Sequence, residues 1–201
     1  MILTGGKDKS LKLWRLKRRE DGETRRDNLN GQRTALIQAD LVGFSSNLNG
    51  GFAFALASDI RVAGESMKMN SAFIKIGLSS CDMGVSYFLP RLVGVTFASE
   101  MMLTGRFVDA GRALSIGLVN EVVPDSGLEK AGQVFVDEML ATSPMGLRLT
   151  KEGLNMSIDA GSLEAAMAIE NRNQVLCSGT EDFKEGLQAF VEKRPPRYSD
   201  T

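Results

Sequence analysis

The most constraining feature of the sequence is a change of pattern along the chain. In its first part, Ala-rich and amphipathic stretches alternate with β-branched runs, as in residues 52–57 followed by residues 59–63. Residues 128–192 instead predict four consecutive helices, separated by Ser-Pro, Gly-Ser and Ser-Gly-Thr breaks. We therefore expect an α/β core over residues 1–124 and a helical region over residues 125–201.

The beginning of the chain is patterned less clearly. Residues 1–4 predict a buried strand that enters a turn at Gly5 and Gly6. In the charged stretch that follows, Leu13 and Leu16 could share one face of a helix. We expect the least ordered part of the chain here, within a divergent segment over residues 7–49.

The sequence contains no histidine, which excludes Ser-His-Asp and Cys-His catalysis and every His-ligated metal site. Its two cysteines, Cys81 and Cys177, lie too far apart for a CxxC metal site, and two are too few for a disulfide framework. We therefore expect no metal. Any catalysis has to use carboxylates, hydroxyls, thiols, lysine or backbone amides.

Composition and charge narrow the class of protein. Apolar residues form 43% of the 201 residues and charged residues 24%, as in a globular domain, and no apolar run reaches the length of a membrane span. Residues 7–27 hold nine basic and five acidic residues, which could contact an anion such as phosphate, RNA or a membrane surface. A solvated charged segment is the favoured interpretation. We expect a cytoplasmic protein with neither a nucleic-acid nor a membrane partner.

Several short motifs occur in a characteristic order. They are GGFAFALASDIR at residues 50–61, LPRLVG at 89–94, MLTGR at 102–106, IGLVNEVVP at 116–124 and FVEKR at 190–194. Together they resemble the crotonase family, the enoyl-CoA hydratases and isomerases, here shortened at the N-terminus. The resemblance implies a spiral of β-β-α units that form two nearly perpendicular sheets, followed by helices for assembly into a trimer or a dimer of trimers. It also implies an acyl-CoA substrate from fatty acid metabolism, with CoA as part of that substrate and no separate cofactor.

The resemblance also implies where the substrate is bound. An enolate oxygen that forms on the thioester needs hydrogen-bond donors, and the family supplies one backbone N–H from its Gly-Gly turn, which matches Gly50. The other residues implied to contact the substrate or its CoA are Gly51, Met83, Gly84, Phe190 and Lys193. From the residues alone, the Gly-Gly pair could equally be a tight turn before a packed helix, and Lys193 a basic residue that complements a helix dipole.

Two positions depart from the family's hydratases. These enzymes hold a water between two glutamates, and the matching residues here are Ala53 and Phe73, which cannot transfer a proton. Asp82 lies in a loop where some members of the family that shift double bonds, or displace a substituent on a ring, carry an aspartate, and one carboxylate in a dry pocket suffices for a 1,3-proton shift. Asp82 could equally cap the helix that begins near Met83. Its neighbour Cys81 fits a small buried residue better than a nucleophile.

A further departure lies upstream. Residues 7–26 do not match the family's segment that supplies the second N–H donor and encloses the adenine of CoA, and residues 34–49 do not match the strand that leads into the Gly-Gly turn. Two readings follow. The first is an acyl-CoA enzyme in which Asp82 and Gly50 isomerise a double bond, with isomerase favoured over hydratase (a lyase). The alternative is a catalytically inactive member that binds acyl-CoA or serves in assembly.

Overall fold

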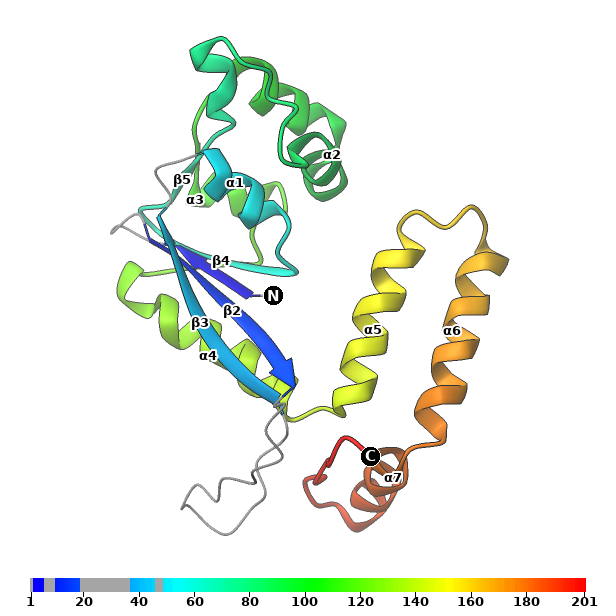
Figure 1. The fold of residues 1–201 in the computed structure, drawn as a ribbon. Helices are drawn as coiled ribbons and strands as arrows, with labels where there is room; N and C mark the ends of the chain where they lie inside the picture. The colour runs from blue at the N-terminus through cyan, green and yellow to red at the C-terminus, as the bar shows by residue number, and fades with distance from the viewer. Residues whose placement is uncertain (1, 6–9, 19–36, 46–48) are drawn as a thin grey trace. The chain divides into compact units, whose positions relative to one another are not determined.

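The structure is a computed structural model that describes residues 2–5, 10–18, 37–45 and 49–201 (Figure 1). The chain forms two compact units. One contains residues 1–16 and 39–136, and the other contains residues 17–38 and 137–201. Among the helices that the structure describes, none is both long enough and apolar enough to cross a membrane.

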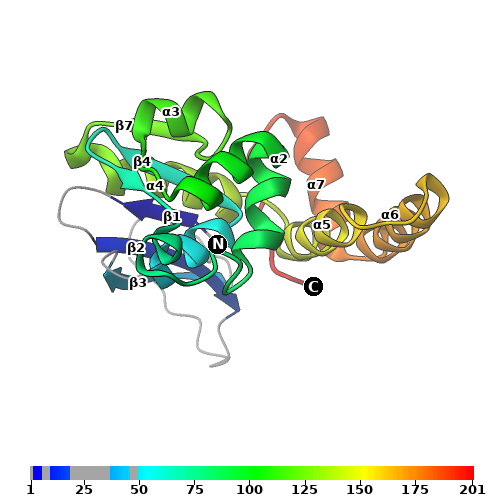
Figure 2. The same ribbon diagram turned by 90° about the horizontal axis from the view of Figure 1, so that it is seen from above.

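A five-stranded sheet organises the first unit. Its strands are β1 (Ile2–Gly5), β2 (Ser10–Arg18), β3 (Ile37–Ser45), β4 (Ile60–Gly64) and β7 (Glu121–Val123). They follow the order β3-β2-β1-β4-β7, as the labels in Figure 2 show. Strand β1 is antiparallel to β2 and parallel to β4, and β4 is parallel to β7. The predicted strand at the start of the chain is thus confirmed, and it lies in the middle of the sheet.

The helical face suggested by Leu13 and Leu16 is wrong, because both residues lie in strand β2. In this strand Leu13 lies opposite Leu3 and Trp14 opposite Ile2 of β1. A strand that is paired along its length satisfies its backbone groups through its neighbour. Pairing between strands therefore overrides a weak helical spacing in the sequence.

Three helices of the first unit contribute most of its apolar core: α1 (Asn49–Leu56), α2 (Val85–Thr104) and α3 (Ala110–Ser115). The core also includes residues of β4 and of the loop before β7. Its largest buried side chains are Leu56, Leu89, Met101, Leu118 and Val85. Helices α1 and α2 pack against each other, and residues near the start of each helix belong to this same apolar core.

Helix α2 contains two residues that often interrupt helices, Pro90 and Gly94. Pro90 lies inside the helix, whereas Gly94 leaves helical geometry with φ 77° and ψ 160°. This backbone conformation is essentially restricted to glycine, so Gly94 sets the kink. Pro90 is the sixth residue of α2 and removes one intrahelical backbone donor, but the backbone at this position stays helical.

A small two-stranded sheet lies beside these helices in the first unit. Strand β5 (Lys68–Met69) pairs with β6 (Val108–Asp109), and the 3₁₀ turn η1 (Ala72–Ile76) follows β5. The Asp109 side chain accepts a hydrogen bond of 2.8 Å from the backbone N–H of Arg112, so Asp109 is the N-cap of α3.

Gly105 and Gly77 have similar left-handed backbones but different surroundings. Comparing alanine substitutions at the two positions therefore distinguishes the cost of backbone strain from the cost of crowding. Both are left-handed C-caps, Gly105 of α2 with φ 58° and Gly77 of η1 with φ 82°. A Cβ on Gly105 would lie 2.6 Å from Cγ2 of Ile74, whereas nothing lies within 4 Å of a Cβ on Gly77.

We expect Gly77→Ala to cost about 1 kcal/mol from the left-handed backbone alone. Gly105→Ala should cost about 2–4 kcal/mol, because crowding adds to the same backbone strain. Urea unfolding of the two variants measures the difference. If the two variants lose equal stability, the crowding at Gly105 costs nothing, because Ile74 of η1 can move away from the added Cβ.

The predicted run of helices is confirmed. After the 3₁₀ turn η2 (Asp125–Gly127), the helices are α4 (Leu128–Leu140), α5 (Pro144–Ser157), α6 (Leu163–Ser178) and α7 (Glu181–Glu192). Hydroxyl side chains cap the last three at their N-termini: Ser143, Ser162 and Thr180 each accept from a backbone N–H three residues on. These local signals explain why the sequence pattern located the helices so closely.

The last residues of the chain fold back onto α7 within the second unit. The buried Asp182 carboxylate accepts hydrogen bonds from the backbone N–H groups of Ser199, at 2.7 Å, and Asp200, at 3.1 Å. Arg148 of α5 forms two hydrogen bonds with the Asp200 carboxylate, and this pairing raises the pKa of the guanidinium above its usual range. The tail thus joins α5 to α7.

Candidate functional site

The Gly-Gly pair lies at the beginning of α1, where Gly50 and Gly51 are the second and third residues of the helix. The first backbone N–H groups of a helix have no partner inside it, so they can serve an external acceptor. Phe52 and Ala53 follow at once, and both are buried in the core. The start of α1 therefore has backbone N–H groups that no residue within the helix can accept from, while its next residues hold it in place.

The other end of α1 is held by Arg61, a buried residue with 5% exposure in strand β4. Its Nε donates to the Leu118 carbonyl at 2.7 Å, and its Nη1 donates to the Ser58 carbonyl just after α1. Its backbone N–H donates to the Asn120 side chain at 2.9 Å, and the Asn120 N–H returns a bond to the Arg61 carbonyl. Burial lowers the pKa of Arg61, while nearby Asp59 opposes that shift. Arg61 is not among the residues predicted from the sequence to form the site.

The loop that carries Asp82 leads directly into α2. Asp82 and Met83 are exposed, and the backbone is left-handed at Met83, with φ 48°, and at Gly84, with φ 85°. The Asp82 carbonyl accepts a hydrogen bond of 2.9 Å from the Val85 N–H. The alternative that the Asp82 side chain caps α2 is wrong: the N-cap is Gly84, and no side chain caps this end. The left-handed turn shifts the helix start beyond the reach of that side chain.

Neither position that matches a hydratase glutamate holds an acid. Ala53 is 3% exposed on α1, and Phe73 is partly buried in η1. Over residues 49–104, the acidic residues are Asp59, Glu65, Asp82 and Glu100. Of these, Asp59 follows the C-terminal end of α1, and Glu100 pairs with Arg106 at 2.8 Å. Asp82 is the acid at the N-terminal end of α2.

Cys81 corrects a further expectation, because it is exposed rather than buried. The loop turns its backbone outward here, so a small apolar side chain gains no burial. Met101 is a core residue as predicted, and Met83 is 50% exposed beside Asp82. In the described part of the chain, no three Cys, Asp or Glu residues gather in a way that could hold a metal ion.

The implied CoA contacts at the C-terminus lie in the second unit. Phe190 is 83% exposed on α7, and Lys193 is the C-cap of this helix in the left-handed conformation, with φ 54°. The Lys193 N–H donates to the Phe190 carbonyl at 3.3 Å. The structure thus places Gly50, Gly51, Asp82, Met83 and Gly84 in one unit, and Phe190 and Lys193 in the other.

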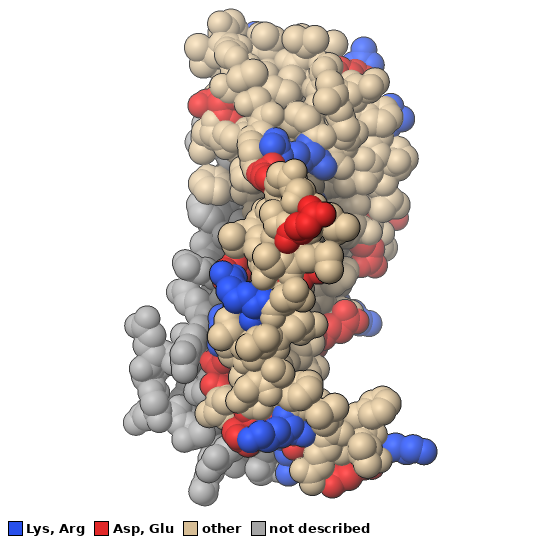
Figure 3. Space-filling view, turned by 90° about the vertical axis from the view of Figure 1, so that its right-hand side faces the viewer, with Lys and Arg blue, Asp and Glu red and all other residues tan. Residues whose placement is uncertain are grey.

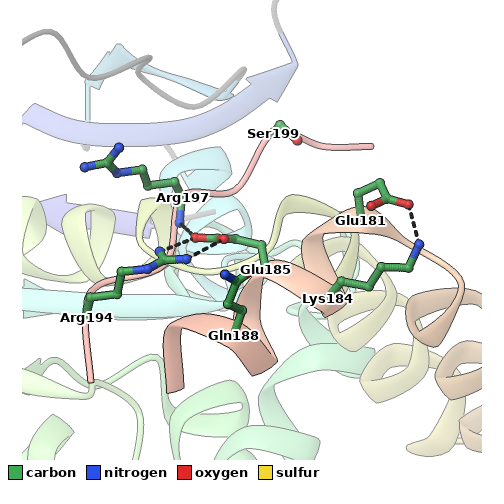
Figure 4. A pocket seen from close by; sticks show the side chains of 7 residues that line it. All are labelled: Glu181, Lys184, Glu185, Gln188, Arg194, Arg197 and Ser199. Atoms are coloured by element: carbon green, nitrogen blue, oxygen red, sulfur yellow. Dashed lines mark hydrogen bonds and ion pairs between the residues drawn. The ribbon is translucent and has the colours of Figure 1, made fainter. Parts of the chain in front are cut away.

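A pocket of about 580 Å³, next to Lys193 in the second unit, was not predicted. Its lining residues are mostly charged: Glu181, Lys184, Glu185, Gln188, Arg194, Arg197 and Ser199. Figure 4 shows Arg194 aimed at Glu185, with N–O distances of 2.6 and 2.9 Å, while the Arg197 side chain points away. Glu185 also accepts a bond of 2.7 Å from the Arg197 N–H. Arg194 is thus largely neutralised by Glu185, which limits its attraction for a phosphate.

Glu185 makes the second unit sensitive to acid. Its hydrogen bonds to Arg194 and then to the Arg197 N–H lower its pKa from 4.5 to about 2. A carboxyl group with a lowered pKa in the folded state stabilises the fold above its unfolded pKa. This stabilisation is lost as the pH falls from about 4.5 to about 2.

We expect the melting temperature of the wild type to fall more steeply over this pH range than that of Glu185→Gln. The matched control is Glu181→Gln, because Glu181 pairs only with the exposed Lys184 in the contacts seen around it. Thermal melts between pH 6 and 2 measure both. Parallel curves for the wild type and Glu185→Gln would contradict the expectation.

One face of the described residues carries charges of both signs. On the face drawn in Figure 3, basic and acidic side chains are interspersed, and neutral side chains cover most of the area. The basic segment at residues 7–27 falls largely outside the described residues. Its suggested anion contact therefore stays a prediction.

Comparison with known proteins decides the family. A model described as enoyl-CoA hydratase/isomerase matches residues 36–201. The chain belongs to the enoyl-CoA hydratase/isomerase family. A probable enoyl-CoA hydratase of Mycobacterium tuberculosis is 42% identical over 154 residues, which cover 76% of this chain and 54% of the relative. A short-chain-enoyl-CoA hydratase of Clostridium acetobutylicum is 29% identical over 206 residues, covering 96% of this chain and 77% of the relative.

Solved structures agree. A probable enoyl-CoA hydratase/isomerase from Mycobacterium abscessus superposes with a TM-score of 0.72 and 38% identity, covering 76% of this chain and 59% of that structure. An enoyl-CoA hydratase from Bacillus anthracis gives a TM-score of 0.73 and 34% identity, covering 76% and 58%. The expected crotonase fold is thereby confirmed. The matched region spans just over half the length of the mycobacterial relative.

Proposed function

We propose that this member of the enoyl-CoA hydratase/isomerase family binds an acyl-CoA thioester and moves a double bond along its acyl chain. Membership of the family supports the substrate class. The observation that carries the choice of reaction is the set of acids. Ala53 and Phe73 replace the glutamate pair, while Asp82 lies just before α2, and α2 packs against α1, the helix that contains Gly50 in its first turn.

The chemistry of the proposal requires only one acid–base group. The Asp82 carboxylate removes a proton from C2 of a 3-enoyl thioester, and the electron pair moves onto the thioester oxygen as an enolate. The protonated Asp82 then gives the proton to C4 as the enolate collapses, which leaves a 2-enoyl thioester. The isomerisation neither adds nor removes water, so it does not require the pair of glutamates that holds a water in the hydratases.

Gly50 supplies the complementary electrostatics. The negative charge on the enolate oxygen is stabilised by a backbone N–H and by the partial positive charge at the start of α1. Glycine lets the backbone approach the ligand closely, since no side chain intervenes. In this proposal Gly51, Met83 and Gly84 surround the acyl portion, and Phe190 and Lys193 contact CoA.

A second candidate function is a catalytically inactive acyl-CoA-binding or assembly protein. Ala53 and Phe73 favour it, because the usual acid–base pair is absent. As an acyl-CoA-binding protein, the second candidate takes the same ligand as the first and differs from it only in turnover. Conversion of 3-enoyl-CoA to 2-enoyl-CoA, followed by the ultraviolet absorbance of the conjugated product, separates them.

We infer that the C-terminal helices carry a subunit contact, as the family's fold implied. Large apolar side chains are exposed on α6 and α7, among them Leu163, Val175, Phe190 and Val191. Exposed apolar surface of this kind marks an interaction site. Light scattering should give the mass of a trimer or of a dimer of trimers, and a monomer would contradict the inference.

Acyl-CoA binding is tested by thermal melting. At a concentration of about one hundred times its dissociation constant, a fatty acyl-CoA should add about 2.7 kcal/mol to the free energy of unfolding. The melting temperature should therefore rise clearly. The control is the free fatty acid with CoA added separately, which lacks the thioester. A cooperative melt without any shift would exclude both candidate functions that bind the ligand.

A further inference from the structure

The loop between η1 and α2 has a single buried side chain. Residues 77–83 are all exposed apart from Ser80, which is 5% exposed. The ends of the loop are held by backbone bonds: the Leu78 N–H donates to the Phe73 carbonyl, and the Val85 N–H donates to the Asp82 carbonyl. Between these ends, the buried Ser80 provides the side-chain anchor.

Ser80 donates a hydrogen bond to a backbone carbonyl of α2 that has no partner within the helix. Its hydroxyl donates to the Met102 carbonyl at 2.8 Å. Because α2 ends at Thr104, the Met102 carbonyl is among the last four of the helix, which lack an intrahelical partner. The Arg106 N–H, which would reach this carbonyl in a longer helix, contacts the Thr104 hydroxyl oxygen at 3.2 Å instead. Ser80 thus ties the loop to the C-terminal turn of α2.

This anchor lies close to Asp82 along the chain. Two residues of backbone span at most about 7 Å, so fixing Ser80 narrows the positions that Asp82 can reach. Between them, the Cys81 N–H donates to the Ser79 hydroxyl oxygen at 3.0 Å, which stiffens the turn. The Asp82 loop is therefore held by the far end of the helix that it precedes.

We propose that Ser80 is a positioning residue, which holds the Asp82 carboxylate in place for proton transfer. The inference rests on the proposed isomerase function. Ser80 is buried with its hydroxyl on the Met102 carbonyl, so in this proposal it acts on proton transfer through Asp82 and not by contact with the substrate. Proton transfer depends steeply on the placement of the acid–base group, whereas binding of the CoA portion does not depend on Ser80.

Ser80→Ala tests the proposal in the full chain. We expect kcat for 3-enoyl-CoA isomerisation to fall about 10- to 100-fold, with KM changed by no more than about threefold. Ser80→Thr keeps the hydroxyl and should restore most of kcat, which also covers the case in which the alanine variant folds poorly. The matched control is Ser71→Ala, because Ser71 is equally buried and its hydroxyl has no partner among the described residues.

A double variant distinguishes positioning from a general structural role. If Ser80 acts through Asp82, adding Ser80→Ala to Asp82→Asn should lower the residual kcat no further. Hydrogen exchange over residues 78–84 should rise in Ser80→Ala and stay unchanged in Ser71→Ala. A folded Ser80→Ala with wild-type kcat, or an equal loss in the Asp82→Asn background, overturns the role of Ser80. A wild type without isomerisation overturns the proposed function, and the role of Ser80 with it.

Discussion

Replacing Arg61 with methionine is expected to lower the free energy of unfolding by about 3 kcal/mol. The guanidinium donates to the carbonyls of Leu118 and Ser58, and both of these residues are buried. Methionine matches much of the length of arginine but donates nothing, so these two acceptors lose their partner. Removing a buried charge recovers part of its desolvation cost, which keeps the loss below the sum of two full penalties.

The matched control is Arg106→Met, since Arg106 forms an exposed ion pair with Glu100. Such pairs contribute about 0–1 kcal/mol, so this variant should unfold near the wild type in urea. Arg61→Lys should fall between the two, because lysine can reach one carbonyl but cannot bridge both. If Arg61→Met and Arg106→Met unfold alike, the Arg61 bonds do not stabilise the joint between β4 and α1.

Elements with local signals could be predicted from the sequence. The boundaries of α5, α6 and α7 follow from the hydroxyl caps Ser143, Ser162 and Thr180, and that of α3 from Asp109. Each of these signals lies within a few residues of the element it defines. Such elements keep their form because cap and helix satisfy each other's hydrogen bonds.

Elements that depend on distant partners could not be predicted in this way. Strand β2 forms because it pairs with β1, although Leu13 and Leu16 had suggested a helix. The buried role of Arg61 depends on Leu118, which is 57 residues away in sequence. Ser80 likewise finds its acceptor 22 residues on, at Met102. Nothing in the neighbouring sequence distinguishes Ser80 from the exposed Ser79.

The candidate site could be predicted from the sequence only in part. Gly50 and Asp82 could be selected from motif and loop position, but the two interpretations of Asp82 could not be separated in the sequence. The left-handed turn at Met83 and Gly84 separates them, because it moves the helix start past the Asp82 side chain. Asp82 is therefore an exposed acid whose side chain does not cap α2, and its part in proton transfer stays a proposal.

Asp82→Asn is expected to lower kcat for 3-enoyl-CoA isomerisation about 10²- to 10⁴-fold. Asparagine has nearly the same shape but can neither accept nor return a proton at this position. Because the Asp82 carboxylate does not cap α2, stability should change little. The rise in melting temperature with acyl-CoA should also persist, since the Gly50 N–H and the CoA contacts are unaltered. Loss of turnover with retained binding is therefore the expected result.

The control for this variant is Asp109→Asn, which removes an exposed acid while asparagine can still cap α3. It should keep wild-type turnover within about twofold, because Asp109 takes no part in the proton shift. Unchanged isomerisation in Asp82→Asn would reject Asp82 as the acid–base group. Since Ala53 and Phe73 cannot transfer a proton, the reaction would then need an acid from outside this loop, and the role of α2 in the site would fall with it.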